Sequence, residues 1–225
     1  MYGLIFDVDG VIADTEAVNA QASIQVFAEL LDIEGVRRED FEAGLGRGAA
    51  AYVRAAAYAH GVELDDAQVD AATAARQATF LSILDNGPLP AFPGVLELMT
   101  AALEHDDFEV AIATSSTREK SQAVLESAGV PWTELVYITG SDVTHRKPHP
   151  ELFLLAAREI DVDPPRCIVI EDAPNGVEAA HAAGAMCIAV TNSLPAGKLA
   201  AADRVVDSLA GIEIEDLLRL FEAPH

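Results

Sequence analysis

The feature that most constrains the fold is a series of short, continuously apolar segments. The expected strands are residues 3–6, 109–113, 135–138, 167–170, 187–190 and 204–206. Segments with helical periodicity separate the later strands, for example 118–128, 150–160 and 176–183. Strands that are apolar throughout and alternate with helices are buried on both faces, as in a parallel sheet covered by helices on each side. The pattern predicts an α/β fold with a doubly wound, Rossmann-like parallel sheet.

An Ala-rich block interrupts this alternation directly after the first expected strand. Its expected helices are 21–31, 49–59 and 67–84. Turn-forming residues at 86–90 end the block. We therefore predict two domains, an α/β core made of residues 1–14 and 89–225 and an inserted all-helical cap made of residues 15–88.

The composition is that of an acidic globular protein. Of 225 residues, 51% are hydrophobic and 23% charged, and the formal net charge is -23. Such a surface repels nucleic acid and anionic membranes, so neither is an expected partner. No apolar run approaches the roughly 20 residues of a membrane-spanning helix, and the apolar start is too short for a signal peptide. We expect a cytoplasmic monomer; its acidity suits a high-salt cytoplasm, although solubility explains it equally well.

Polar residues stand where the expected strands end. Asp7 and Asp9 follow the first strand, Thr114 follows the second, and Asp172 follows the fourth. Lys147 lies in the connection before the next helix. In a doubly wound sheet the carboxyl ends of the strands share one edge, and ligands bind there. These five residues are therefore expected to converge, although they span most of the chain.

Their chemistry suits phosphoryl transfer. Three carboxylates placed together repel one another, so a hard, oxygen-seeking cation such as Mg²⁺ is expected. Asp7 can be both metal ligand and nucleophile, because carboxylates form acyl-phosphate intermediates. The hydroxyls of Thr114 and Ser116 and the ammonium of Lys147 would bind phosphoryl oxygens. Asp9 would protonate the leaving oxygen and then activate water. A lone Asp-x-Asp-Gly also occurs in turns and calcium loops, so the prediction rests on the elements together.

The same residues resemble the haloacid-dehalogenase superfamily of aspartate-nucleophile phosphatases, in the branch that has a helical cap after the first motif. The matching segments are residues 6–15, 114–116, 147–148 and 170–176. The resemblance implies that Asp7 is the nucleophile and Asp9 the general acid and base. It further implies that Mg²⁺ is held by the Asp7 carboxylate, the Asp9 backbone carbonyl and Asp172, with Glu171 at or next to these ligands.

Residues present or absent separate the activities known in this superfamily. Its dehalogenases lack the second aspartate, so Asp9 argues against that activity. Its phosphonate-cleaving members use a Schiff-base lysine in the cap, whereas all three lysines here lie outside residues 15–88. Beta-phosphoglucomutase is the nearest competitor, but Asn19 stands where such mutases carry a histidine. We therefore expect a phosphatase acting on a small phosphorylated metabolite, such as a sugar phosphate, with a phosphosugar mutase as the alternative.

Substrate contacts are expected from both domains. Arg76 falls near the cap lysine of the mutases, and Arg47 lies in a Gly-rich loop at 44–48 where they place substrate contacts; the alternative for both arginines is a solvated helix surface. That loop superficially suggests a nucleotide site, but no strand precedes it, which favours a helix-entry loop. The residues expected to bind substrate are Thr114, Ser115, Ser116, Lys147, Arg47 and Arg76.

Three further alternatives concern side chains outside this set or a different class of protein. Cys167 and Cys187 are expected to be reduced core residues, with a disulfide between neighbouring strands as the alternative. His145 and His149 could form a metal site, but we expect them to be exposed loop residues, because carboxylates already supply a hard-cation site.

Bacterial receiver modules use the same acids, hydroxyl and lysine as a switch. Their nucleophile usually follows a middle strand, whereas Asp7 follows the first strand, which favours an enzyme.

Overall fold

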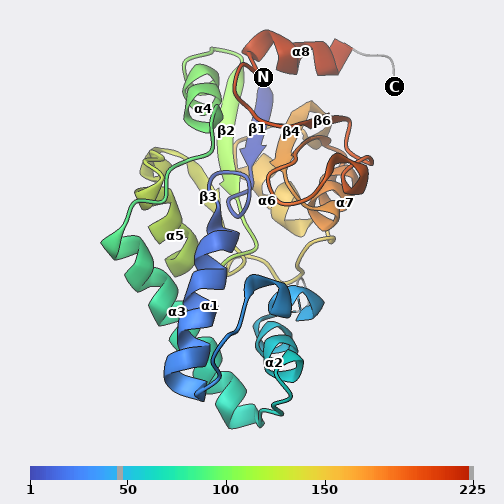
Figure 1. Ribbon diagram of the computed structural model, residues 1–225. Coiled ribbons are helices and arrows are strands. Elements are labelled where there is room, and N and C mark those ends of the chain that lie inside the picture. Colours follow the sequence, from blue (N-terminus) through green and yellow to red (C-terminus); the bar gives the residue numbers. More distant parts are fainter. Residues whose placement is uncertain (45–47, 223–225) are drawn as a thin grey trace. The chain divides into compact units, whose positions relative to one another are not determined.

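The computed structural model describes residues 1–44 and 48–222 (Figure 1). The chain divides into two compact units, Met1–Asp14 with Leu89–His225 and Thr15–Pro88. We refer to them as the first unit and the second unit. In the part of the chain that the structure describes, no helix combines the length and apolar character needed to cross a membrane.

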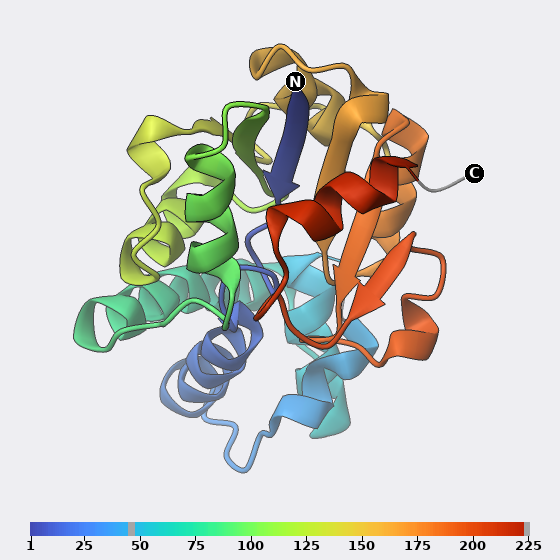
Figure 2. The same ribbon diagram turned by 90° about the horizontal axis from the view of Figure 1, so that it is seen from above.

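The first unit is built on a six-stranded, all-parallel sheet in the order β3-β2-β1-β4-β5-β6. The strands are β1 (Tyr2–Phe6), β2 (Phe108–Ala113), β3 (Val136–Ile138), β4 (Cys167–Glu171), β5 (Met186–Val190) and β6 (Arg204–Val206). Figure 2 shows β1, in dark blue, near the middle of the sheet between β2 and β4. The α/β doubly wound fold and all six strands expected from the sequence are confirmed.

Helices follow the strands of the first unit and bury both faces of the sheet. They are α4 (Val95–Leu103), α5 (Arg118–Ser127), α6 (Glu151–Glu159), α7 (Pro174–Ala183) and α8 (Ile214–Glu222). One face packs against α6 and α7; Ile5 of β1 and Val169 of β4 share a core cluster with Phe153 of α6. Their neighbours Leu4 and Ile168 point to the other face and are also fully buried. Burial on both faces explains why these strands are apolar throughout.

Two of these helices, α4 and α8, were not predicted. Helix α4 begins after Gly94, which adopts a left-handed φ of 87°. Helix α8 is short and exposes most of its charged residues, while Phe221 packs its ring on Tyr2 with the centroids 4.5 Å apart. Helix α4 has only nine residues and packs on β2, so its local pattern is a weak signal. The apolar residues of α8, by contrast, recur at helical spacing, and the prediction overlooked this pattern.

The second unit is helical, and its described residues contain no strand. Its helices are α1 (Thr15–Leu31), the 3-10 helix η1 (Arg38–Gly44), α2 (Ala49–Ala59) and α3 (Asp66–Asn86). Phe27, Phe41 and Tyr52 form an aromatic core, with Phe41 stacked on Tyr52 at 4.5 Å between ring centroids. Helix α3 starts at a capping box in which Asp65 and Gln68 satisfy each other's backbone amides.

The two chain segments of the first unit that flank this insert are paired with each other. Ala13 bridges Ala91 in antiparallel fashion, and the amide of Phe92 donates to the carbonyl of Ile12 at 2.7 Å. The chain therefore leaves the first unit and returns to it at one place.

Cys167 and Cys187 are both buried and carry free thiols. They lie on the neighbouring strands β4 and β5, where Val169 is the register partner of Cys187. The expectation of two reduced core cysteines is confirmed.

We predict that Gly94→Ala costs far more stability than Gly211→Ala. Both glycines have a positive φ, 87° and 80°, but a Cβ at Gly94 would lie 2.1 Å from the Leu209 backbone, whereas the space beside Gly211 is open. The left-handed backbone alone should cost roughly 1–2 kcal/mol at each site. The collision should add about 1–3 kcal/mol at Gly94 only. Urea unfolding measures both; equal losses would show that the close approach does not matter.

Candidate active site

The turn after β1 brings the backbone at Gly10 close to the Asp172 carboxylate, at the carboxyl edge of the sheet. Asp7 is 5% exposed, and its amide donates to the carbonyl of Ile170 at 3.1 Å, so it continues the pairing of β1 with β4. Gly10 follows with a φ of 76°, and a Cβ there would stand 1.9 Å from the Asp172 Oδ2. Only glycine allows the backbone beside Asp9 to approach the Asp172 carboxylate so closely.

Lys147 is the cation that contacts Asp7. Its Nζ lies 2.6 Å from the Asp7 Oδ1 and 2.6 Å from the Glu171 Oε1, and its side chain is 5% exposed. Burial lowers the pKa of Lys147, but the charges of Asp7 and Glu171 outweigh burial and raise the pKa above its ordinary value. The lysine therefore stays charged and joins the turn before α6 to the ends of β1 and β4.

Glu171 is fully bonded within the protein. Its Oε1 accepts from Lys147, and its Oε2 accepts from the amides of Asp172 and Ala173 at 2.8 and 2.9 Å. A Cβ at Gly176 would lie 1.8 Å from the Oε1, so α7 can approach this carboxylate only through a glycine. These contacts make Glu171 the partner that holds Lys147; its contact with a metal stays a prediction.

The residues after β2 reach Asp9 rather than Asp7. Ser116 Oγ donates to the Asp9 Oδ2 at 2.5 Å, and Lys120 Nζ lies 3.1 Å from the Asp9 Oδ1. The Ser116 amide in turn donates to the hydroxyl of Thr114, which is fully buried. Ser115 is partly exposed, and its carbonyl accepts from Arg146 at 3.4 Å.

Sequence reasoning missed three residues of the site. Lys120 lies in the first turn of α5, the helix that follows the predicted 114–116 segment. Asn192 and Ser193 follow β5: Asn192 donates to the Gly10 carbonyl at 2.9 Å, and the Ser193 side chain bonds to Asp172. Polar residues gather after the strands of such a sheet, and this rule would have found Asn192 and Ser193. It was not applied to β5, because no acid follows that strand.

The donor set fits a magnesium ion. Burial raises the pKa of Asp7 well above its ordinary value; Lys147 opposes this shift, and the neighbouring acids add to it. Burial and then the charge of Glu171 raise the pKa of Asp172 to about 7. The donor atoms are the carboxylate oxygens of Asp7 and Asp172 and the backbone that Gly10 brings close to them. They form an all-oxygen set with surplus negative charge, which is the kind of site that Mg²⁺ takes.

Arg76, predicted to bind substrate, lies mostly inside the second unit. Its Nε donates to the Ser23 hydroxyl at 2.7 Å, and its guanidinium lies over the Tyr52 ring, 4.5 Å from the centroid. Burial lowers the pKa of Arg76, and Tyr52 and Glu16 oppose that shift. Substrate contact by Arg76 stays a prediction, and Arg47 lies outside the described residues.

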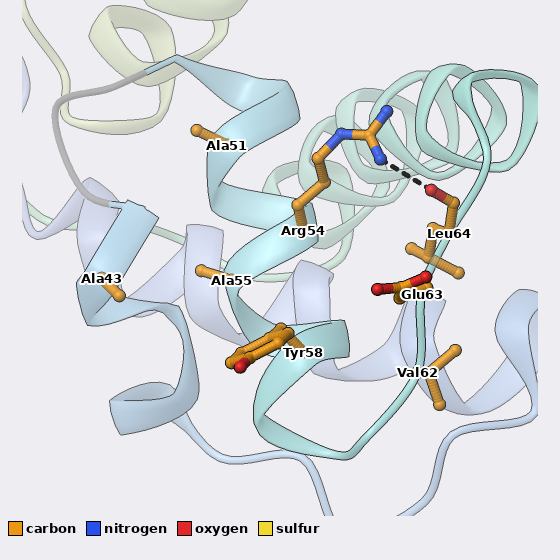
Figure 3. Close-up of a pocket in the computed structure, with 8 residues that line it drawn as sticks. All are labelled: Ala43, Ala51, Arg54, Ala55, Tyr58, Val62, Glu63 and Leu64. Atoms are coloured by element: carbon orange, nitrogen blue, oxygen red, sulfur yellow. Dashed lines mark hydrogen bonds between the residues drawn. The ribbon is translucent and has the colours of Figure 1, made fainter.

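A cavity of about 480 Å³ lies in the second unit and contains none of the described residues predicted for the site (Figure 3). Its wall is mostly apolar, and Arg54 closes one side by donating to the Leu64 carbonyl at 2.6 Å. The lining residues are Ala43, Ala51, Arg54, Ala55, Tyr58, Val62, Glu63 and Leu64.

Comparison with known proteins gives a consistent family. A family model described as haloacid dehalogenase-like hydrolase matches residues 2–184. Protein SUPPRESSOR OF QUENCHING 1, chloroplastic, from Arabidopsis thaliana is 35% identical over 222 residues; the match covers 96% of this chain but only 20% of that protein. Fructose-1-phosphate phosphatase YqaB from Escherichia coli is 33% identical over 186 residues, which cover 81% of this chain and 92% of YqaB.

A solved structure agrees over nearly the full length. The crystal structure of a single-residue mutant of CbbY from Rhodobacter sphaeroides, in complex with xylulose-(1,5)bisphosphate, has a TM-score of 0.81 and 29% identity to this chain. The superposition covers 96% of this chain and 99% of the CbbY chain. The arrangement of a parallel sheet with an inserted helical unit is therefore shared with a protein that binds a sugar bisphosphate.

We predict that the metal-free protein loses stability as pH rises from about 4 to about 7. Folding raises the pKa of Asp172 to about 7. Ionisation of this carboxyl is therefore harder in the folded state, and the stability present at low pH is lost as pH rises through the folded pKa. In EDTA, the free energy of unfolding of Asp172→Asn should be larger than that of the wild type by a few kcal/mol at about pH 8. At about pH 4 the two should be equal.

Thermal melts across this pH range measure the effect. The exposed Asp106→Asn, in the turn before β2, serves as the control and should follow the wild type. With saturating Mg²⁺, the melting temperature of the wild type should depend much less on pH. Parallel curves for wild type and Asp172→Asn in EDTA would contradict the prediction.

Proposed function

The chain belongs to the haloacid dehalogenase-like hydrolases, and from this membership we propose that it is a Mg²⁺-dependent phosphatase of a small phosphorylated metabolite. The observation that carries the proposal is the pairing of the buried Asp7 carboxylate with the charged Lys147 at the carboxyl edge of the sheet. The phosphatase YqaB and the bisphosphate complex of CbbY support a sugar phosphate as the substrate class.

In the proposed reaction Asp7 attacks the phosphorus in line with the ester bond. A bond forms between the Asp7 carboxylate oxygen and phosphorus, and the bond to the leaving oxygen breaks. Asp9 gives the leaving oxygen its proton and then takes a proton from the water that attacks the aspartyl-phosphate. Inorganic phosphate leaves and the Asp7 carboxylate is restored.

The remaining side chains bind and position. Lys147 and the Thr114 hydroxyl would hold the phosphoryl oxygens, and Ser115 and Ser116 would add donors from the same segment. Ser116 and Lys120 fix the carboxylate of Asp9 through contacts of 2.5 and 3.1 Å.

The donor set proposed for Mg²⁺ is the Asp7 and Asp172 carboxylates and the Asp9 backbone carbonyl. The ion would neutralise negative charge on the phosphoryl oxygens during transfer. Glu171 would act on the reaction through Lys147, which it contacts at 2.6 Å, and through its charge, which raises the pKa of Asp172.

We predict that Asp7→Asn abolishes turnover and leaves the fold intact. The amide has nearly the shape of the carboxylate but is a very poor nucleophile toward phosphorus, so the rate should fall roughly a thousandfold or more. Release of phosphate from fructose 1-phosphate with Mg²⁺ measures the rate, and circular dichroism checks the fold. Asp106→Asn, at the opposite edge of the sheet, should keep full activity. Appreciable turnover by purified Asp7→Asn would refute the covalent mechanism.

The mutase alternative predicts a different product. A mutase must exclude water while a sugar phosphate rebinds to the aspartyl-phosphate in the opposite orientation. The backbone carbonyl of Asn19, in α1, accepts from the Ser23 hydroxyl at 2.6 Å. The neutral side chain of Asn19 cannot carry a proton as a histidine does. We therefore expect the aspartyl-phosphate to hydrolyse readily.

The assay supplies beta-glucose 1-phosphate with a trace of glucose 1,6-bisphosphate and follows both products. Inorganic phosphate should be the main product, and Asp7→Asn should give the background of each measurement. Glucose 6-phosphate that accumulates much faster than inorganic phosphate would show that the enzyme is a mutase.

A further inference from the structure

A second group of metal-binding side chains lies on the turn that carries Lys147. One ring nitrogen from each of His145 and His149 and one carboxylate oxygen of Glu151 lie within 4.8 Å of one another. The Nδ1 atoms of His145 and His149 stand 2.7 and 4.0 Å from the same oxygen, Glu151 Oε2. The two rings are stacked, with their centroids 4.4 Å apart. Two imidazoles thus face one carboxylate.

Glu151 is held in place before any ligand binds. Its Oε1 accepts from the Thr144 amide at 2.8 Å, and its Oε2 accepts from the His145 amide at 2.9 Å. The Thr144 bond, followed by those from His145, lowers the pKa of Glu151 to about 2. The turn is therefore closed around a fixed anion at the start of α6, and this anion can act as one ready-made ligand.

The donor chemistry differs from that of the carboxylate site. Nitrogen ligands combined with one carboxylate suit Zn²⁺ and its first-row neighbours, whereas Mg²⁺ takes oxygen alone. We propose that His145, His149 and Glu151 form a second metal site, for Zn²⁺ or a similar divalent transition metal, separate from the proposed Mg²⁺ site.

The present geometry is close to what such an ion needs. Ligand atoms about 2.0 Å from a tetrahedral ion lie roughly 3.3 Å apart. The side chains of His145 and His149 are 61% and 50% exposed, so each ring can rotate the short distance inward. If it used the Nδ1 atoms, the ion would replace the hydrogen bond between His145 and Glu151 and the bond that the Glu151 amide donates to the His149 Nδ1 at 3.2 Å. Water would complete its coordination.

A metal at this site would act on the conformation of the turn. Lys147 lies between the two histidines in the sequence and points inward to Asp7, while the histidine side chains are exposed. The His149 amide donates to the Arg146 carbonyl at 3.0 Å, so the histidine backbone and the lysine belong to one closed turn. An ion that joins His145 to His149 therefore restrains the segment that presents Lys147.

The test is titration of the full chain with Zn²⁺ by calorimetry, in saturating Mg²⁺ so that the carboxylates are already occupied. The wild type should bind Zn²⁺, and the double variant His145→Ala, His149→Ala should bind at least about tenfold more weakly. His181→Ala is the matched control and should bind as the wild type does. His181 is also exposed and paired with a carboxylate, Asp203 at 2.9 Å, but no second histidine joins this pair among the described residues. Equal melting temperatures in EDTA show that the variants fold.

Two results would overturn the proposal. They are no Zn²⁺ binding by the wild type and unchanged binding by the double variant. Hydrogen exchange supplies a readout that does not depend on activity: Zn²⁺ should slow exchange at the amides of residues 144–151 in the wild type and not in the double variant. Exchange that Zn²⁺ leaves unchanged in the wild type would refute the restraint on the turn of Lys147.

Discussion

The contact of Lys147 with Asp7 and Glu171 is the interaction on which the rest of the site depends. Burying three charged groups costs several kcal/mol per ion unless each is paired and hydrogen-bonded. Both contacts of the lysine are 2.6 Å, and two backbone amides bond the far oxygen of Glu171. The pairing of β1 with β4 brings the two acids within reach of one cation. The sheet thus supplies the geometry that makes a buried charge tolerable.

The same edge carries more negative charge than its lysines balance. Burial disfavours ionisation of Asp7 and Asp172, and the neighbouring acids add to this effect. In the proposed enzyme this surplus is the source of metal affinity, because a bound cation relieves a repulsion that the fold has already built in. Gly10 and Gly176 serve the same end, since a Cβ at either position would collide with a carboxylate.

Much of the sheet followed from the sequence, because a strand buried on two faces must be apolar throughout and a ligand-binding edge must be polar. Lys147 shows which contacts could be predicted from the sequence and which could not. Its place near Asp7 was predicted from the topology, but its bond to Glu171 was not, because side-chain pairing depends on the exact turn before α6. Lys120 was missed because nothing in a helical pattern shows which residue of the first turn faces Asp9. The contacts of Arg76 with Ser23 and Tyr52 likewise arise from packing between distant helices.

The pairing of Ala13 with Ala91 has a consequence for how such a chain can change. Two hydrogen-bonded segments hold the ends of the insert together, and the entropy of closing a loop grows only slowly with its length, by about 0.6 kcal/mol per doubling. The second unit joins two antiparallel, paired segments, as the loop of a hairpin does. It can be lengthened, shortened or exchanged while β1 keeps its register and Asp7 its position. The insert and the residues at the edge of the sheet can therefore evolve separately within one polypeptide.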